Sequence, residues 1–279
     1  MKKAIRLILI TACLAVFCYA GYMLFSTLQE YRTADSFYET AANQFVTVVS
    51  PAPSVQTPEQ SSAGTHSSSP TTSSPAKPPT AEEQPEPKET APIKIDFDSL
   101  LAFNSDVVGW LYCDDTVINY PIAKGINNNQ YLRTMLDGSY NSSGTLFMDY
   151  RCESDFSCDN TVIYGHNMKN GSMFHTLLNY REQDFYDSHP VLYLLTPTQD
   201  YALHLFAGFT VPSDSWVYTF WFDEENSPET FLQQCTEGSD FQASFTPVPG
   251  DPIITLSTCT YEYDTARYVV LGVLKPIDN

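Results

Sequence analysis

A cysteine and an arginine lie close together near the C-terminal end of the chain, in the stretch TLSTCTYEYDTAR at residues 255–267. Cys259 ends an apolar, strand-like run, the polar segment 260–266 can turn the chain, and a second strand-like run begins at Arg267. We therefore expect an antiparallel hairpin that places Arg267 level with Cys259. A guanidinium beside a thiol favours the thiolate and can bind a developing oxyanion, so this pair suits nucleophilic acyl chemistry.

Strand periodicity places Cys259 on the polar face of its own run. Side chains alternate between two faces, so Thr255 and Ser257 share the face of Cys259, whereas Leu256 and Thr258 point to the other. A cysteine that only fills a core more often shares the face with Leu256. Thr255, Ser257 and Thr258 are candidates to line or support a substrate groove, and Ser257 is the candidate for a hydrogen bond to substrate. Ordinary filling of a strand explains these three residues equally well.

A thiol nucleophile needs a partner for proton transfer, and His166 leads among the five histidines. It lies in the strand-like run NTVIYGHN at 160–167 and precedes a loop, a usual position for a side chain that projects over the end of a sheet. Tyr164 and Asn167 flank this histidine and are candidates to orient it or to contact substrate. The other histidines have simpler interpretations as a solvated, packing, turn or sheet residue, namely His66, His175, His189 and His204.

The seven cysteines give no metal-binding pattern, because no pair has the close C-x-x-C spacing that zinc sites usually use. We therefore assign no metal site. Two cysteines lie in an apolar N-terminal segment and five lie in the C-terminal part of the chain, namely Cys13 and Cys18, then Cys113, Cys152, Cys158, Cys235 and Cys259. Cys152 and Cys158 could close a short disulfide loop or remain thiols, since connectivity does not follow from sequence.

The N-terminus predicts a single membrane anchor. Uncharged, mostly apolar residues run from Leu7 to Phe25, about the length that crosses the hydrocarbon core of a bilayer as a helix. Lys2, Lys3 and Arg6 precede this run, so the N-terminus should remain in the cytoplasm and the rest of the chain should lie outside the cell. A cleaved signal peptide is the alternative, although its apolar region is usually shorter.

Three regions are expected along the chain. Residues 1–26 form the cytoplasmic flank and transmembrane anchor. Residues 27–92 begin as a helix-compatible stalk and continue, from Ser50 to Pro92, as a segment rich in Pro, Ser and Thr without any aromatic residue. Such a segment cannot bury enough apolar surface to fold, so it predicts a disordered spacer that sets the reach of the domain. Residues 93–279, where the aromatic residues return, form the exported domain.

The net charge of the whole chain limits the classes of molecule that it can bind. The formal net charge is -19, with 14 Lys and Arg residues in 279, which argues against a phosphate backbone as ligand. We therefore exclude nucleic acid. An acidic surface favours cationic or amine-bearing partners over a long range, but it also serves solubility alone.

The exported domain is predicted to be mainly β, an antiparallel or mixed barrel with a few short helices, because many short strands occur without a series of long helices between them. Eight runs rich in β-branched and aromatic residues are the expected strands, at 107–113, 117–123, 144–150, 160–167, 190–196, 201–211, 252–259 and 267–274. Three helices are expected, at 97–104, 172–181 and 227–238, the first capped by Asp96 or Asp98 and the last opened by Ser227 and Pro228.

These motifs together resemble the sortase family, and specifically its class B. TLSTC followed by TYEYDTAR is similar to the Cys-to-Arg signature of the family, and NTVIYGHNM is similar to its histidine motif. GWLYCDDTVINYPIA and GTLFMDYR resemble the segments that precede these motifs, and SPETFLQQCTEG falls where class B members carry a helix. The similarity runs from Phe97 to Leu274 with the motifs in the family's order, whereas the long Pro/Ser/Thr segment is not typical of every member.

The resemblance implies an eight-stranded β-barrel and a membrane-anchored cysteine transpeptidase of a Gram-positive cell surface. Cys259 would cleave a C-terminal sorting motif of surface proteins after threonine, through a thioester acyl-enzyme, and His166 would act as general acid and base. Arg267 would hold the substrate carbonyl or stabilise the oxyanion. An amine of a peptidoglycan precursor or of a pilin lysine would then accept the acyl group, and no cofactor is implied.

Two alternatives compete with this interpretation. A hydrolytic, papain-like cysteine peptidase also uses Cys and His, but its nucleophile usually opens a helix near the start of the mature domain. Cys259 instead ends a strand near the C-terminus. The second alternative is a non-catalytic surface or adhesion module in which Cys259 is structural.

Overall fold

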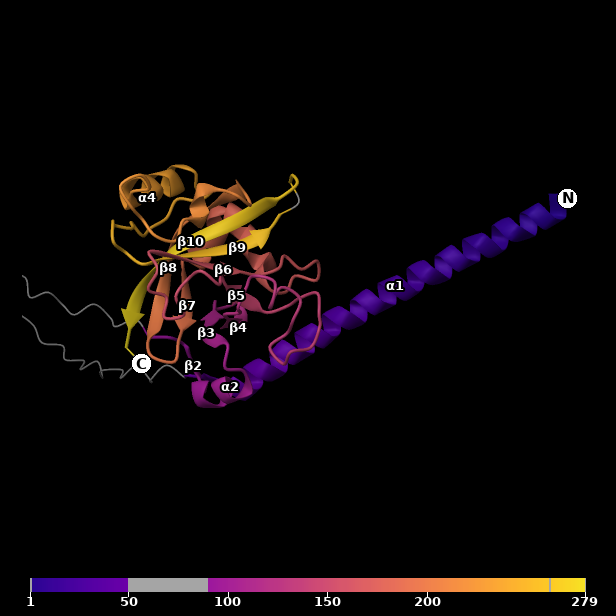
Figure 1. The fold of residues 1–279 in the computed structure, drawn as a ribbon, viewed down its shortest axis with the longest axis horizontal. Coiled ribbons are helices and arrows are strands. Elements are labelled where there is room, and N and C mark those ends of the chain that lie inside the picture. The colour runs from indigo at the N-terminus through magenta and orange to yellow at the C-terminus, as the bar shows by residue number, and fades with distance from the viewer. Residues whose placement is uncertain (1, 50–89, 261, 279) are drawn as a thin grey trace, which may run out of the picture.

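The computed structural model describes residues 2–49, 90–260 and 262–278. Eight strands close into a barrel in the order β10-β8-β7-β3-β4-β5-β6-β9 (Figure 1). Their bounds are β3 Val107–Tyr112, β4 Asn119–Ala123, β5 Leu146–Met148, β6 Asn160–Tyr164, β7 Val191–Leu195, β8 Asp200–Pro212, β9 Ile253–Cys259 and β10 Ala266–Ile277. All eight strands expected from the sequence are present, and the prediction of a mixed barrel is confirmed.

Two of the barrel's pairings are parallel and the other six are antiparallel. The parallel pairs are β4 with β5 and β6 with β9. Strands that pair in a closed barrel have no free edge, and side chains on both of their faces pack against other groups. In β9, for example, every residue before Cys259 is buried, including Thr255. The alternation of polar and apolar faces in this strand therefore does not separate solvent from core.

Short helices pack around the barrel, and two of them, α2 and α4, begin at the capping residues that the sequence predicts. Asp96 caps α2 by accepting a hydrogen bond from the amide of Ser99, and Ser227 caps α4 in the same way through the amide of Thr230. The helices are α2 Phe97–Phe103, the 3-10 helix η1 Phe174–Arg181, α3 Gln183–Ser188, the 3-10 helix η2 Trp216–Tyr218 and α4 Pro228–Glu237. The sequence analysis missed α3 and η2, which are both very short.

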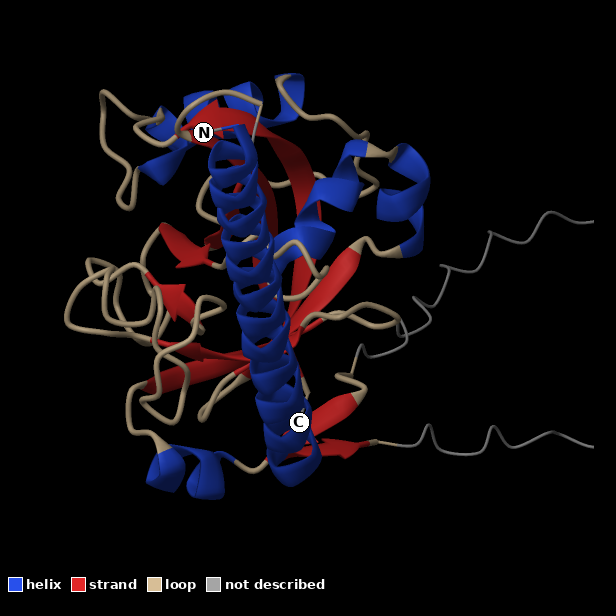
Figure 2. Cartoon of the chain, turned by 90° about the vertical axis from the view of Figure 1, so that its right-hand side faces the viewer, coloured by secondary structure: helices blue, strands red, loops and turns tan. Residues whose placement is uncertain are grey.

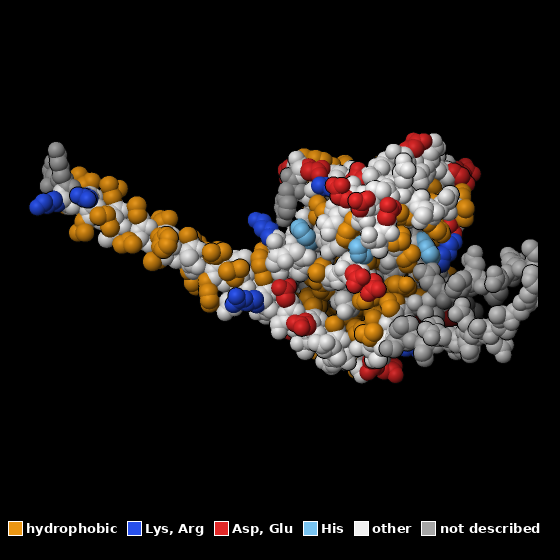
Figure 3. All heavy atoms as spheres, turned by 180° about the vertical axis from the view of Figure 1, so that it is seen from behind, with side chains coloured by type: hydrophobic (Ala, Val, Ile, Leu, Met, Phe, Trp, Pro, Cys, Tyr) orange, Lys and Arg blue, Asp and Glu red, His pale blue; other side chains and the backbone are white. Residues whose placement is uncertain are grey.

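The N-terminal helix α1, Lys2–Phe45, is one continuous helix that includes the predicted membrane span and the helix-compatible residues after it. Its N-terminal part projects away from the barrel and exposes apolar side chains along its length, with Lys and Arg at its free end (Figures 1 and 3). This part has the length and the apolar composition of a helix that can cross a membrane. Residues 27–45, which we call the packed half of α1, lie against the barrel domain.

The packed half of α1 buries one stripe of side chains at helical spacing. The stripe consists of Ala34, Tyr38, Ala41 and Phe45, each no more than 6% exposed. Figure 2, which looks at the molecule from the side of α1, shows this helix in front of the strands. Small alanines, rather than large apolar residues, make up half of this stripe.

A two-stranded sheet of β1, Val46–Val48, and β2, Ile93–Ile95, joins the end of α1 to the start of the barrel domain. The amide of Val49 donates to the carbonyl of Pro92 at 2.8 Å. The spacer predicted for residues 50–92 lies almost entirely outside the described residues.

Candidate active site

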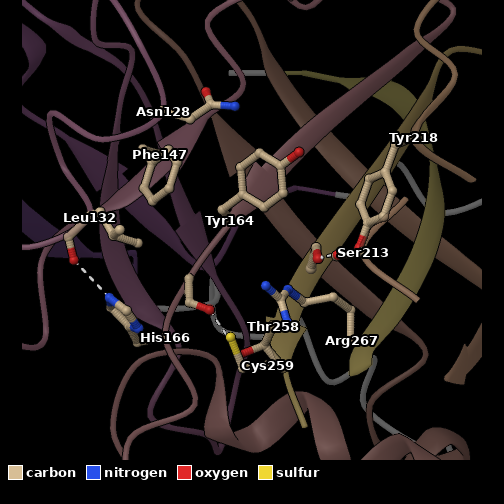
Figure 4. A pocket seen from close by; sticks show the side chains of 12 residues that line it. Asn128, Leu132, Phe147, Tyr164, His166, Ser213, Tyr218, Thr258, Cys259 and Arg267 are labelled. Carbon is tan, nitrogen blue, oxygen red and sulfur yellow. Dashed lines mark hydrogen bonds between the residues drawn. The ribbon is translucent and has the colours of Figure 1, made fainter. Parts of the chain in front are cut away.

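A cavity of about 240 Å³ lies where β6, β9 and β10 end, and Cys259, His166 and Arg267 all line it. The sequence therefore identified three side chains from distant segments that the fold brings to one place (Figure 4). The full lining consists of Asn128, Leu132, Phe147, Tyr164, Gly165, His166, Ser213, Tyr218, Ser257, Thr258, Cys259 and Arg267.

The hairpin of β9 and β10 places Cys259 directly opposite Arg267, as the sequence predicts. The thiol is partly exposed at the end of its strand. One guanidinium nitrogen of Arg267, Nη1, donates to the carbonyls of Thr265 at 3.2 Å and Ala266 at 3.0 Å. These contacts hold the guanidinium at its own strand, and Figure 4 shows it turned toward the cavity on the side of Cys259.

The parallel pairing of β6 with β9 brings His166 to the same end of the barrel. Tyr164, the last residue of β6, is the register partner of Ser257, and His166 follows just beyond the end of β6. The amide of Gly165 continues the ladder by donating to the carbonyl of Ser257 at 3.1 Å. Three segments thus present a thiol, an imidazole and a guanidinium to one cavity.

Gly165 is required because its backbone lies close to the side chains of Leu146 and Phe174. A Cβ atom at this position would lie 2.5 Å from the side chain of Leu146 and 2.6 Å from the ring of Phe174, which is too close for any other residue without a shift. The hydroxyl of Thr258 donates to the carbonyl of Gly165 at 2.8 Å. The side chain of Thr258 therefore fixes the backbone on which the imidazole is carried.

The imidazole of His166 is held by the backbone of a neighbouring loop. Its Nε2 lies 2.7 Å from the carbonyl oxygen of Leu132, which can only accept, so Nε2 carries a proton and Nδ1 is the nitrogen left to take one up. Burial lowers the pKa of His166 below its ordinary value of 6.5, the hydrogen bond to Leu132 opposes this, and Arg133 lowers the pKa further. The imidazole is thus neutral at neutral pH.

Two tyrosines, Tyr164 and Tyr218, form another part of the cavity wall. The hydroxyl of Tyr218 lies 2.9 Å from the hydroxyl of Ser257, and the hydroxyl of Tyr164 donates to Asp149 at 3.0 Å. Asp149 also accepts from the guanidinium of Arg151 at 2.8 Å. Burial, with Asp149 beside it, raises the pKa of Tyr164 well above its usual range, so this hydroxyl remains a neutral donor. Ser257 and Tyr164 both line the cavity, and Ser257 is 1% exposed.

Two of the residues that the sequence analysis proposed for substrate contact lie elsewhere. Thr255, the first of them, is completely buried and donates to the side chain of Asn160 at 2.8 Å. Asn160 in turn donates to the carbonyls of Val217 and Thr219, both at 2.9 Å. Thr255 therefore supports the segment that carries Tyr218, and its side chain does not line the cavity.

Asn167 is the second of these residues. Its Nδ2 donates to the carbonyl of Cys259 at 2.9 Å, and its Oδ1 lies 2.7 Å from Nδ1 of His175. The side chain of Asn167 thus holds the backbone of Cys259, and it is not among the residues that line the cavity. A sequence pattern cannot reveal a contact of this kind, because it joins a side chain to a backbone carbonyl far away in the chain.

Several cavity residues were missed from the sequence. They are Asn128, Leu132, Phe147, Gly165, Ser213 and Tyr218. Most of them lie on loops, and loop residues show no periodicity that would reveal which way they face. The stretch SDSWVYTFWF at 213–222, which contains Tyr218, is unusually aromatic for a connection and was the one available signal.

The charge of the cavity suits an anionic intermediate. Of the described residues that line it, Arg267 alone has a fixed charge, and the remaining walls are neutral. Among the described residues, no group of three or more His, Cys, Asp or Glu side chains could hold a metal ion. The arrangement can therefore support attack by a thiolate on a carbonyl, with Arg267 as the group that balances negative charge.

We expect a thiol-alkylating reagent to label Cys259 before the other domain cysteines. The four others are buried, and burial raises the pKa of Cys113 to about 11 and that of Cys152 to about 12, so these thiols supply very little thiolate near neutral pH. Peptide mapping after timed exposure to iodoacetamide should show labelling of Cys259 at least roughly tenfold faster than at Cys113 or Cys152. Equal rates would contradict the site.

Acidification is expected to destabilise the fold through His166. Because the pKa of His166 in the folded chain lies below 6.5, the unfolded chain binds more protons as the pH falls from about 6.5 to the folded pKa. The unfolding free energy should therefore be highest above this window and fall as the pH descends through it. Urea unfolding at several pH values would measure the effect, and the variant His166→Gln should show a shallower decline. An equal decline in both would contradict this assignment.

A thiol, an imidazole and a guanidinium at the open end of an eight-stranded barrel define a cysteine-dependent acyl-transfer enzyme. The model of the sortase domain matches residues 111–275, more than half of the chain. Sortase B of Listeria monocytogenes is 35% identical over 184 residues, which cover 65% of this chain and 75% of the relative.

Two solved structures give the same result. The Staphylococcus aureus sortase B–substrate complex has a TM-score of 0.61 and 29% identity, and the match covers 65% of this chain and 85% of the solved one. A crystal structure of sortase B complexed with triglycine has a TM-score of 0.62 and 29% identity, and the match covers 65% of this chain and 86% of the solved one. The chain therefore belongs to the sortase family, as a class B member and a cysteine transpeptidase.

Proposed function

We propose that Cys259, His166 and Arg267 carry out the transpeptidation together. The thiol of Cys259 gives its proton to Nδ1 of His166, and the resulting thiolate attacks the carbonyl carbon of a threonine in a sorting motif. A carbon–sulfur bond forms and the carbonyl oxygen becomes an oxyanion beside the guanidinium of Arg267. The peptide bond after threonine then breaks, and His166 returns the proton to the departing amine.

The second half of the reaction reverses these steps with a new amine. The incoming amine attacks the thioester carbon, its proton passes to His166, and the carbon–sulfur bond breaks to restore Cys259. The observation that supports this proposal is that Cys259, His166 and Arg267 all line one cavity, with Cys259 directly opposite Arg267 in the β9–β10 hairpin. The hydrogen bond from Nε2 to Leu132 supports Nδ1 as the nitrogen that moves the proton.

We assign the substrate and the acceptor by analogy with the relatives. One matched structure is a sortase B–substrate complex, and another contains triglycine, a peptide with a free amine. For this chain we propose a C-terminal sorting signal of surface proteins as substrate and an amine of a peptidoglycan precursor or of pilin as acceptor. Ser257, Thr258 and Tyr164 would contact the substrate, because all three line the cavity.

We further propose a topology with a single membrane crossing. The exposed apolar part of α1 would span the membrane, with Lys3 and Arg6 at its cytoplasmic end. Residues 1–26 would then form the anchor and residues 93–279 the catalytic domain outside the cell. The packed half of α1 would belong to that outer domain, since it lies against the barrel.

The test is transfer to a defined amine. The full chain in detergent micelles is incubated with a panel of sorting-signal peptides, with and without triglycine or a lysine-containing peptide, and products are weighed by mass spectrometry. We expect a ligated product that requires both the peptide and the amine. Cleavage without ligation at saturating amine would indicate a hydrolytic cysteine peptidase, and no cleavage of any peptide would favour a non-catalytic surface module.

A further inference from the structure

The packed half of α1 contacts both loops that flank His166. One loop, residues 124–145, joins β4 to β5 and supplies the carbonyl of Leu132 that binds the imidazole. The other, residues 165–173, begins directly beside His166. We propose that the packed half of α1 is a positioning element for His166, so that the helix which leads to the membrane also completes the active site. This inference rests on the proposed role of His166.

Glu30 and Tyr38 hold the first loop. The carboxylate of Glu30 accepts from the amide of Ser142 at 2.7 Å, and its backbone carbonyl accepts from the side chain of Asn141 at 3.0 Å. The hydroxyl of Tyr38 donates to the carbonyl of Gly144. Gly144 has a positive φ of 56°, a conformation that favours glycine, so this turn is built for one arrangement.

The part of the loop held by α1 is bonded directly to the part that carries Leu132. The amide of Asn141 donates to the carbonyl of Arg133 at 3.0 Å, and the amide of Thr145 donates to the carbonyl of Tyr131 at 3.1 Å. Residues 131 and 133 are the immediate neighbours of Leu132. A displacement of this turn from α1 would therefore move the carbonyl that orients the imidazole.

Asp35 holds the second loop. Its two carboxylate oxygens accept from the side chain of Asn170 at 3.1 and 3.0 Å. The same loop closes on itself next to the imidazole, since the amide of Phe174 donates to the carbonyl of His166 at 2.9 Å. The backbone on either side of the imidazole is thus fixed from the same helix.

The geometry separates a positioning role from a general structural one. Within the part of the chain that the structure describes, the closed barrel contains no residue of α1, and α1 contributes nothing to the lining of the cavity. The thiol of Cys259 and the guanidinium of Arg267 are held by the β9–β10 hairpin instead. Release of α1 should therefore misplace the imidazole while the thiol, the guanidinium and the cavity wall formed by Ser257, Thr258 and Tyr164 remain in place. Small misplacements of a catalytic group lower kcat strongly.

The experiment compares two double variants of the full chain in detergent micelles. Glu30→Ala with Asp35→Ala removes the two carboxylate contacts and leaves Tyr38 in place, and Gln29→Ala with Ser36→Ala changes exposed neighbours on the same helix. We expect kcat for peptide transfer to fall about tenfold or more in the first variant, with KM within about twofold. The control variant should match the wild type. Glu30→Gln with Asp35→Asn, which keeps an oxygen acceptor at each position, should restore most of the activity.

A second readout does not depend on turnover. In chains with isotope-labelled histidine, NMR titration of His166 should give a pKa closer to its ordinary value in the Glu30→Ala/Asp35→Ala variant, because a looser loop admits water to the imidazole. This titration remains informative even if the wild type transfers no peptide, so failure of the proposed function is separable. A folded variant with unchanged kcat and unchanged titration of His166 would overturn the inference, as would an equal loss in the control.

Discussion

Replacement of Cys259 by alanine is expected to abolish peptide transfer, with a loss of at least about 1,000-fold in kcat, because no other thiol lines the cavity among the described residues. The two serines in the lining are poor substitutes. Ser257 is engaged with Tyr218, and a hydroxyl is far less acidic than a thiol. Transfer of a labelled peptide to triglycine measures the loss.

The fold should survive this change. The side chain of Cys259 is partly exposed at the end of β9, and its backbone is held by the pairing with Arg267 and by the side chain of Asn167. Circular dichroism should therefore be unaltered, and the thioester with peptide, visible by mass spectrometry in the wild type, should be missing. A matched control is Cys235→Ala, which removes a buried thiol from α4. If Cys235→Ala abolished transfer as fully as Cys259→Ala, the nucleophile would be misassigned.

Local patterns predicted the strands and the hairpin of the site. The runs of β-branched and aromatic residues, with turn-forming residues between them, marked all eight strands of the barrel. The hairpin that joins Cys259 to Arg267 is a local feature, since only a short turn separates its strands. Its register could therefore be read from the spacing of two residues.

The parallel pairing of β6 with β9 could not be read in the same way. Asn160 pairs with Ile253, and no turn connects these strands to fix their alignment. That alignment depends on the closure of the whole barrel, which is a global property of the fold. His166 was identified from its motif and from its place at a strand end, but its place in the same cavity as Cys259 required the structure.

The packed half of α1 shows a different limit of sequence analysis. An apolar run followed by a mixed helix suggested an anchor that continues outward as a stalk, because hydropathy decides what crosses a membrane. The contacts that attach this helix to the barrel are made by Glu30, Asp35 and Tyr38 with loop residues. Hydrogen bonds between a helix and a loop have no periodicity, so the sequence carries no sign of them.

Replacement of Arg267 is the second large effect that we expect. Loss of one oxyanion donor costs about 100- to 1,000-fold in kcat in comparable sites, and we expect Arg267→Ala to fall in this range. Within the part of the chain that the structure describes, Nη1 of Arg267 donates hydrogen bonds to the carbonyls of Thr265 and Ala266, and the other guanidinium nitrogens donate none. The rest of the guanidinium is therefore available to the substrate.

The variant Arg267→Lys should recover only a small part of this loss. A lysine has a single nitrogen, which cannot be held by the carbonyl of Ala266 and also reach an oxyanion with the geometry of a planar fork. Steady-state kinetics should show the loss mainly in kcat, since the oxyanion forms only after attack. Lys275→Met is the matched control. Lys275 lies at the other end of β10 from Arg267 and is paired with Asp251, so the variant removes a cation of the same strand away from the cavity. Equal losses in Lys275→Met and Arg267→Ala would mean that general charge, and not a placed guanidinium, supports the reaction.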